Sequence, residues 1–296
     1  MARRIVISGG SGLIGSALSE SLRADGVTVT TLVRRPPRHA NERQWAPGER
    51  DLDPDVLAGA DTVVALGGAS VGRLPWTRRY RAELVGSRRR STRTIATAVR
   101  ALAADAPAFV SASAVGYYGS TPGRVLTEQS PAGDTFLAKL CVAWEEEARR
   151  AGEDARIALL RTAPVIHRQG VLAPLIRLTA FGVAGPVGPG TQIWPWISLD
   201  DEVRAIRHVI DADLDGPVNL TGPTPASANE IGRALAQRMR RPFWLPAPTW
   251  AMRLALSRAA TDSLLVSDAD VRPAVLEKTG FVFTHSTAKA AVAAAV

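Results

Sequence analysis

The sequence predicts an α/β fold in which helices cover both faces of a parallel sheet. Over the first 165 residues, short apolar runs alternate with longer helical patterns, and a glycine-rich loop separates the first run from the first helix. The runs are short, apolar or β-branched, and they alternate with helices, as expected for parallel strands buried on both faces. These features together predict a Rossmann-fold, doubly wound parallel sheet with a small C-terminal α/β cap.

The strands and helices follow one another in a regular order. Apolar and β-branched runs predict strands at 3–8, 27–33, 60–66, 108–113, 155–161 and 216–220. Apolar residues at helical spacing predict helices at 13–26, at about 76–104, at 135–151, at 200–211 and from Ser227 to about 239. Asp134 is the expected cap and Gly152 the expected stop of the third helix, and Ser227 with Glu230 form an expected capping box.

Pro and Gly crowd residues 164–196, where the regular pattern loosens, and the uncharged stretch 178–199 is expected to be a loop. We therefore expect a cofactor domain at 1–165, to which about 199–222 returns, and a substrate-side cap made of 166–198 and 223–296.

Composition narrows the class of protein. The chain has 296 residues, is 46% hydrophobic and contains one cysteine, which excludes a disulfide framework and a four-cysteine zinc site. The first apolar run is too short for a signal peptide, and the longest uncharged stretch, 178–199, is broken by Gly and Pro. We expect a cytoplasmic protein, monomeric or homodimeric, with no membrane partner.

The net charge of +8 comes almost entirely from arginine, since only Lys139, Lys278 and Lys289 are lysines. The preference for arginine over lysine indicates a general compositional bias of the sequence rather than a surface that evolved to bind phosphate. Aromatic residues do not interleave the densest basic run, 86–93, and it lies inside a helical pattern. Nucleic acid is therefore not an expected partner.

The glycine loop "SGGSGLIG" predicts a dinucleotide site. Gly9 permits the tight turn, Gly12 lets a pyrophosphate approach the backbone, and Gly15 permits close packing of helix on strand. The following helix, opened by Leu13 and Ile14, supplies N–H groups and a positive dipole end.

The second strand ends at Arg34 and Arg35, where an NAD-specific site would place an acidic residue. Guanidinium groups suit a 2′-phosphate, so we expect NADP(H); the alternative is that both are ordinary surface arginines.

Ordered blocks along nearly the whole chain resemble the extended short-chain dehydrogenase/reductase superfamily. They include "GGSGLIG", "LGGASV", "SASAVGYYG", "LTEQSPAGDTFLAKLCVAWE", "WPWISLDDEVRAI", "GPVNLTGPTPAS" and "EKTGFVF". More narrowly, the chain resembles an atypical branch labelled as NAD-dependent (sugar-nucleotide) epimerase/dehydratase, whose substrates are largely unassigned. The resemblance implies cofactor contacts at Gly9, Gly12, Leu13, Ile14, Gly15, Arg34, Arg35, Leu66, Gly67, Gly68, Ala69, Arg88, Ser111, Cys141 and Pro164.

The superfamily's catalytic pattern is only partly present. Ser113 matches the usual serine, but Leu137 stands at the tyrosine position and Cys141 at the lysine position of Tyr-x-x-x-Lys. Arg88 falls where an asparagine is usual. The resemblance places Cys141 beside the cofactor as an uncharged neighbour, on the apolar face of its helix, and Lys139 in solvent.

Other side chains remain for acid–base work. Tyr117 follows Ser113 by four residues and is either a proton donor or a packing residue with one hydrogen bond. Arg88 is either a structural or cofactor contact or an anchor for a substrate anion. Glu128 is either a base or anchor or, as we expect, a cap or surface residue.

The four histidines lie apart, without metal-ligand spacing, so no metal site is expected. The branch usually has a histidine where this chain has Ser198. Trp76, Trp194 and Trp196 either wall the substrate pocket, which we favour, or belong to the core.

Two functional hypotheses follow. The first is an oxidoreductase or epimerase acting by hydride transfer on an unidentified small molecule. The second is a sensor or interaction protein that binds NADP(H) but has little or no turnover.

Overall fold

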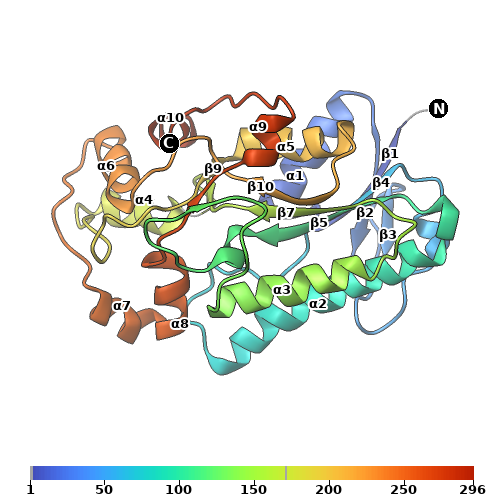
Figure 1. Ribbon diagram of the computed structural model, residues 1–296, viewed down its shortest axis with the longest axis horizontal. Helices are drawn as coiled ribbons and strands as arrows, with labels where there is room; N and C mark the ends of the chain where they lie inside the picture. The colour runs from blue at the N-terminus through green and yellow to red at the C-terminus, as the bar shows by residue number, and fades with distance from the viewer. Residues whose placement is uncertain (1–2, 171) are drawn as a thin grey trace.

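A seven-stranded parallel sheet runs through the computed structural model, which describes residues 3–170 and 172–296 (Figure 1). In spatial order its strands are β10 (Gly216–Leu220), β7 (Ile157–Thr162), β5 (Ala108–Ala114), β4 (Thr62–Ala65), β1 (Arg4–Ser8), β2 (Thr28–Val33) and β3 (Glu42–Gln44). The chain order reverses between β1 and β4. In sheets of this kind, ligands bind outside the carboxyl ends of the strands at such a switch point.

Helices cover both faces of the sheet, which confirms the predicted fold class. α1 (Leu13–Ala24) and α5 (Leu199–Asp211) pack on one face, and α2 (Arg78–Ala101) and α3 (Phe136–Arg149) on the other. Successive side chains of a strand point to opposite faces. Accordingly, Ile5 and Ile7 join the core under α1, whereas Val6 joins the core under α2.

The cap lies at the left of Figure 1, away from β1, β2 and β3. Its helices are α4 (Leu172–Ala180), α6 (Ala228–Arg238), α7 (Thr249–Leu256), α8 (Arg258–Ala260) and α10 (Ala288–Ala295). Two small parallel sheets pair β8 (Val165–Ile166) with β9 (Ile197–Ser198) and β6 (Val125–Leu126) with β11 (Asp270–Val271). α9 (Ala274–Lys278) packs instead against β10, where Leu276 enters the main core.

Short helical turns complete the described chain: 3₁₀ helices at Pro54–Val56, Ala103–Asp105 and Val115–Tyr118 (η3), and a π-helix at Thr261–Leu265. Over the described ranges, no helix combines the length and apolar character that crossing a bilayer requires.

Two expectations about the helices were wrong. The cap of α3 is Thr135, whose hydroxyl accepts the Ala138 N–H at 3.2 Å, and Asp134 lies outside the helix. Residues 178–199 are not all loop, because α4 extends to Ala180. Pro174 falls in the first turn of α4, where proline is tolerated. The capping box of Ser227 and Glu230 is confirmed.

Candidate functional site

The glycine loop between β1 and α1 has the geometry of a phosphate cradle. Gly9 has φ of +78°, and a Cβ there would lie 2.8 Å from the carbonyl carbon of Leu66. A Cβ on Gly15 would clash with the carbonyl oxygen of Gly9. Gly12 donates its N–H to that same oxygen at 3.0 Å. Leu13 and Ile14 then form the first turn of α1, whose N–H groups have no partner within the helix.

The two arginines after β2 have different surroundings. Arg35 donates two hydrogen bonds to the Glu42 carboxylate on β3, at 2.8 and 2.6 Å. This pairing lowers the pKa of Glu42 to about 2. Arg34 is exposed and, over the part of the chain that is described, makes no hydrogen bond or ion pair. Of the pair, Arg34 alone is therefore available to an incoming phosphate without breaking an existing contact.

Arg88 of α2 reaches the end of β4. Its guanidinium donates to the Ala69 carbonyl at 2.9 Å and to the Leu84 carbonyl at 3.1 Å. It packs beneath Gly68, whose added Cβ would lie 3.1 Å from Arg88 Cγ. Burial lowers the pKa of Arg88, and none of the described carboxylates pairs with it. The strand end thus holds a partly buried guanidinium that has no carboxylate partner among the described residues.

Cys141 lies deep in the same region, on α3. It shares one apolar face with Leu137, Leu140 and Trp144, as predicted, and Lys139 is exposed. Burial, and then the nearby Glu145, raises the pKa of the Cys141 thiol to about 12. The Arg88 guanidinium lies 4.9 Å from the ring centroid of Trp144. Trp144 and Cys141 belong to the same apolar cluster.

The remaining strand-end residues lie around this region. Leu66, Gly67 and Gly68 follow β4, Ser111 is fully buried within β5, and Pro164 is exposed after β7. The Pro164 carbonyl accepts the Ile197 N–H at 3.3 Å, which ties β8 to β9.

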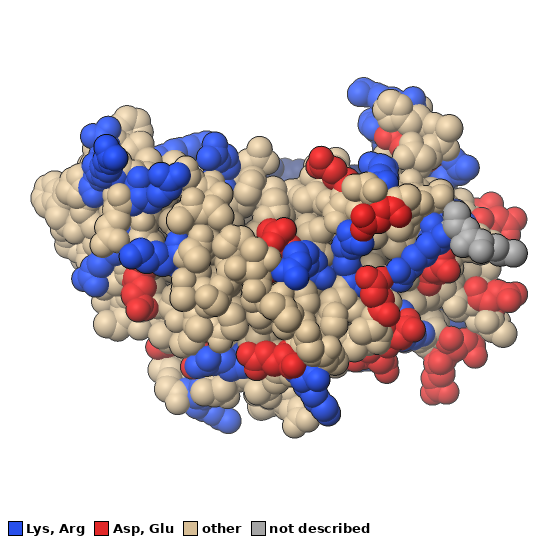
Figure 2. Space-filling view, turned by 90° about the horizontal axis from the view of Figure 1, so that it is seen from above, with Lys and Arg blue, Asp and Glu red and all other residues tan. Residues whose placement is uncertain are grey.

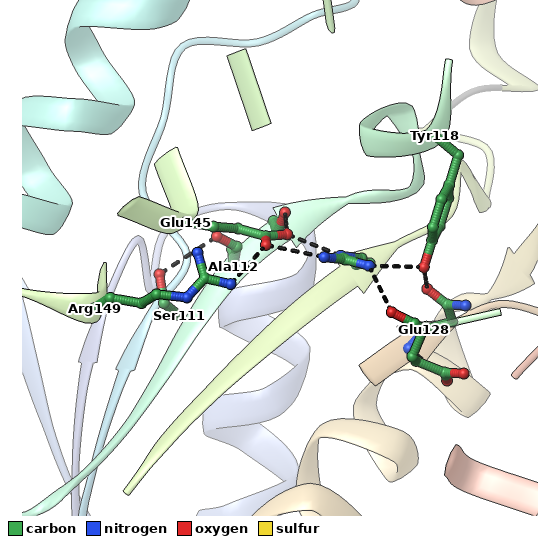
Figure 3. A network of polar contacts seen from close by, with 9 residues as sticks. Ser111, Ala112, Tyr118, Glu128, Glu145 and Arg149 are labelled. Carbon is green, nitrogen blue, oxygen red and sulfur yellow. Dashed lines mark hydrogen bonds and ion pairs between the residues drawn. The ribbon is translucent and has the colours of Figure 1, made fainter. Parts of the chain in front are cut away.

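Ser113 belongs to a buried polar network centred on Arg161 of β7. Its hydroxyl donates to Glu145 Oε1 at 2.7 Å, and Arg161 binds both oxygens of Glu145 at 2.9 and 3.0 Å. Arg161 also donates to the Tyr118 hydroxyl at 2.9 Å. In Figure 3, Glu145 and Arg149 lie to one side of this network and Tyr118 and Glu128 to the other. Ser113 is therefore committed to a structural carboxylate.

The network continues to β10 through Tyr118, which donates to Asn219 Oδ1 at 2.7 Å. Burial raises the pKa of Tyr118 to about 12, so its hydroxyl stays neutral. Glu128 was expected at a cap or on the surface; it is not on the surface, but it accepts an N–H group from the first turn of α9, as a cap does. It is buried, and its carboxylate accepts the N–H groups of Asn219 and Val275, both at 3.1 Å.

The ring of Tyr117 stacks on the guanidinium group of Arg161. The guanidinium carbon lies 3.5 Å from the centroid of the Tyr117 ring. The Tyr117 side chain is partly buried, and no described residue forms a hydrogen bond with its hydroxyl. Arg161 therefore brings the two predicted catalytic residues to one centre, Tyr117 by stacking and Ser113 through Glu145.

Several members of this network were not predicted. Glu145 follows Cys141 by one helical turn on the same face of α3, and Arg161 is the one charged residue of β7. A charge in such a strand could have signalled a buried pair, because buried charges are nearly always paired. Tyr118 and Asn219 offered no comparable signal.

The tryptophans differ from expectation. Trp76 and Trp196 are buried in core clusters rather than along a pocket. Trp194 is partly buried, and its indole N–H donates to the Leu265 carbonyl at 3.1 Å. Two of the three predicted wall residues are therefore packing residues.

An imidazole does stand beside Ser198, although it comes from another part of the chain. His285 Nδ1 lies 3.0 Å from Ser198 Oγ. Asp200, Asp201 and His285 also place possible metal-ligand atoms within 4.8 Å of one another. However, the Asp201 carboxylate accepts hydrogen bonds from Ser198 and from the Thr284 and His285 N–H groups. Because these hydrogen bonds already occupy the Asp201 carboxylate, Asp201 fixes residues 284–285 to the first turn of α5 and is not free to bind a metal ion.

Comparisons with known proteins agree with this geometry. The family model described as NAD dependent epimerase/dehydratase family matches residues 5–220, and a domain of unknown function (DUF1731) matches 247–295. Epimerase family protein Mb2239 of Mycobacterium bovis is 41% identical over 293 residues, covering 97% of this chain and 96% of the relative. The crystal structure of human epimerase family protein SDR39U1 (isoform 2) with NADPH superposes with a TM-score of 0.88. It is 27% identical, covering 99% of this chain and 98% of that one.

Proposed function

Since this chain belongs to the NAD dependent epimerase/dehydratase family, we propose that it binds NADP(H) and acts by hydride transfer, as an oxidoreductase or epimerase, on a small molecule. The observation that carries the choice of NADP(H) is Arg34, which is exposed at the end of β2 and has no ion-pair partner among the described residues. The NADPH in the human SDR39U1 structure supports the same choice. The expected setting is the cytoplasm.

Each part of a bound dinucleotide has candidate contacts among the described residues. Gly9, Gly12 and Gly15, with Leu13 and Ile14, would hold the pyrophosphate, and Arg34 the 2′-phosphate, with Arg35 fixed behind it by Glu42. Leu66, Gly67, Gly68, Ala69, Arg88, Ser111, Cys141 and Pro164 would lie along the nicotinamide half. When bound, the nicotinamide supplies or accepts a hydride. Residues 1–165 with 199–222 would form the cofactor domain, and 166–198 with 223–296 the cap.

Tyr117 is the residue we assign to proton transfer at the substrate oxygen. Its ring is held by Arg161, yet its hydroxyl has no protein partner among the described residues. Ser113 acts in this scheme as a positioning residue, because its hydroxyl binds the Glu145 carboxylate that orients Arg161. Tyr117→Phe should then lower kcat and leave the NADPH affinity unchanged.

Cofactor titration tests the central claim. We expect tighter binding of NADPH than of NADH, measured by nicotinamide fluorescence. Arg34→Ala should weaken NADPH binding roughly tenfold to hundredfold and leave NADH binding unchanged, because it removes a charged hydrogen bond to phosphate. Arg35→Ala is the matched control, with a smaller expected effect. Equal affinities of the wild type for the two cofactors would overturn the NADP(H) assignment.

A ligand that carries only the adenine half of the cofactor tests which half Arg88 contacts. Adenosine 2′,5′-bisphosphate carries the adenine half and the 2′-phosphate but no nicotinamide. If Arg88 lies on the nicotinamide half, Arg88→Met weakens NADPH binding and leaves binding of the bisphosphate unchanged. Equal loss for both ligands would instead assign Arg88 to the adenine half or to folding, which the thermal unfolding midpoint distinguishes.

The second candidate is a cofactor-binding sensor without turnover. Leu137 and the neutral thiol of Cys141 occupy the positions of the usual Tyr and Lys, which favours this alternative. Single-turnover oxidation of bound NADPH, followed by its absorbance across a library of carbonyl compounds, separates the two. Loss of the reduced nicotinamide signal with any carbonyl supports the enzyme. No loss with any of them, while NADPH still binds, supports the sensor.

A further inference from the structure

Large exposed apolar side chains are concentrated at one end of the cap. Seven of the nine in the described chain lie between residues 178 and 254. Five of them form what we call the cap-end patch: Leu178, Phe181, Val183, Trp244 and Leu245. Phe181 is 83% exposed and Trp244 62% exposed, so both protrude from the surface. Apolar patches of this kind on soluble folds usually mark an interaction surface.

Main-chain hydrogen bonds hold the patch together. Two separate segments, the end of α4 and the connection from α6 to α7, meet where Trp244 and Leu245 both donate N–H groups to the Ala184 carbonyl. The connection runs down the left edge of Figure 1 from α6 to α7. The indole N–H of Trp244 donates to the Gly182 carbonyl at 2.9 Å. The exposed ring can therefore enter an apolar phase without leaving a polar atom unpaired.

The same end of the molecule is strongly basic. From Ile231 to Thr261 the chain carries six arginines and no acidic residue. Arg238, Arg240 and Arg241, together with Arg177 of α4, are exposed and make no ion pair with any residue that the structure describes. Figure 2 shows mainly blue groups on the left half of the molecule, whereas the red groups gather at the right end.

We propose that the cap-end patch and its arginines dock onto an anionic lipid surface. Protruding Trp, Phe and Leu side chains insert at the boundary of headgroups and acyl chains, while arginines bind the lipid phosphates. A second copy of the chain fits less well, because a symmetric contact would bring the unpaired arginines of both copies together. A groove-bound peptide fits less well because Phe181 and Trp244, the two most exposed side chains of the patch, protrude from the surface.

This proposal is independent of the proposed function. It also revises the expectation of no membrane partner, which rested on the absence of a spanning segment. The cap-end patch is assembled from two segments that are far apart in the sequence, 178–183 and 244–245, so it leaves no long apolar run in the sequence.

Vesicle co-sedimentation of the full chain tests the proposal. We expect binding to vesicles of phosphatidylcholine with about one quarter phosphatidylglycerol, weakened by salt, and little binding to phosphatidylcholine alone. The double variant Phe181→Ser/Trp244→Ser should lose about tenfold or more in affinity. Arg240→Glu/Arg241→Glu should lose about thirtyfold or more, because each arginine near an anionic surface contributes about fivefold.

Matched controls separate docking from general effects of the substitutions. Val125→Ser/Val282→Ser removes two exposed apolar side chains outside the patch, and Arg23→Glu/Arg100→Glu makes the same charge change at the ends of α1 and α2. Val125→Ser/Val282→Ser should leave vesicle affinity unchanged. Arg23→Glu/Arg100→Glu should lose much less vesicle affinity than Arg240→Glu/Arg241→Glu. Failure of the wild type to bind the anionic vesicles, or equal loss in patch and control variants, would overturn the proposal. So would a self-associated wild type that Phe181→Ser/Trp244→Ser converts to monomer.

Discussion

Cys141 illustrates how burial controls the chemistry of one side chain. Because burial raises its pKa to about 12, only about one thiol in ten thousand is ionised at pH 8. We expect the native protein to react negligibly with a chromogenic disulfide reagent at that pH. After unfolding in denaturant, one thiol per chain should react promptly. Fast reaction of the native protein would contradict the buried placement.

The same residue should contribute little to cofactor binding. Cys141 is neutral and packs among Leu137, Leu140 and Trp144, so it offers no charge to a bound nucleotide. Cys141→Ser is expected to change the NADPH dissociation constant by no more than about threefold, because the two side chains are similar in size. Fluorescence titration of both proteins measures this. A larger loss, with an unchanged thermal midpoint, would assign the thiol a direct contact.

At the scale of the element, the start of α3 tests the corrected cap. Thr135 accepts the Ala138 N–H, so Thr135→Ala should lower the free energy of unfolding by about 1 kcal/mol. Asp134→Ala, one residue earlier and exposed, should change it by less than about 0.5 kcal/mol. Urea unfolding followed by circular dichroism measures both. The reverse order of effects would restore Asp134 as the cap.

Periodicity predicted the elements that bury apolar faces. The strands of the sheet except β3, and the helices α1, α2, α3 and α5, were predicted because their apolar residues recur at regular spacing or in unbroken runs. β3 was missed because it is a three-residue edge strand, Glu42–Gln44, without an apolar residue. α4 was missed because the Pro and Gly that follow it dominate the composition of 164–196.

The candidate site was predictable only where its residues are close in sequence. The glycine loop needs three glycines at fixed spacing, and its expected geometry is present. The Arg161 network joins β5, α3, β7 and β10, so it depends on contacts up to 101 residues apart. Trp76 and Trp196 show the same limit, because their size indicates burial but not whether they face a pocket or a core.

At the scale of the whole molecule, the Arg161 network ties strands, helix and cap together. Arg161 and Glu145 are both almost fully buried, so removing one partner leaves an uncompensated charge. Arg161→Met should lower the free energy of unfolding by about 3–5 kcal/mol. Glu145→Gln in the same chain should recover part of the loss, because it removes the stranded carboxylate. A double variant as unstable as the sum of the two single variants would show that the residues act independently.

Glu202 gives the whole molecule a dependence on pH. It is fully buried in α5, where burial raises its pKa to about 8. Its Oε1 accepts the Thr162 hydroxyl at 2.9 Å, whereas Oε2 has no partner among the described atoms. Between its ordinary pKa of about 4.3 and the raised value, the native state holds a proton that the unfolded chain releases. The contribution of Glu202 to stability therefore falls as pH rises from about 4.3 to about 8.

Glu202→Gln isolates this contribution, because an amide keeps an acceptor for Thr162 but does not titrate. The variant should match the wild type near pH 4 and become more stable than it by roughly 1–4 kcal/mol at pH 8. Denaturant unfolding at several pH values measures the difference. Glu146→Gln, at an exposed position of α3, serves as the control and should show no such trend. A wild type and a Glu202→Gln variant whose stabilities stay parallel across this range would mean that Glu202 is ionised in the folded protein.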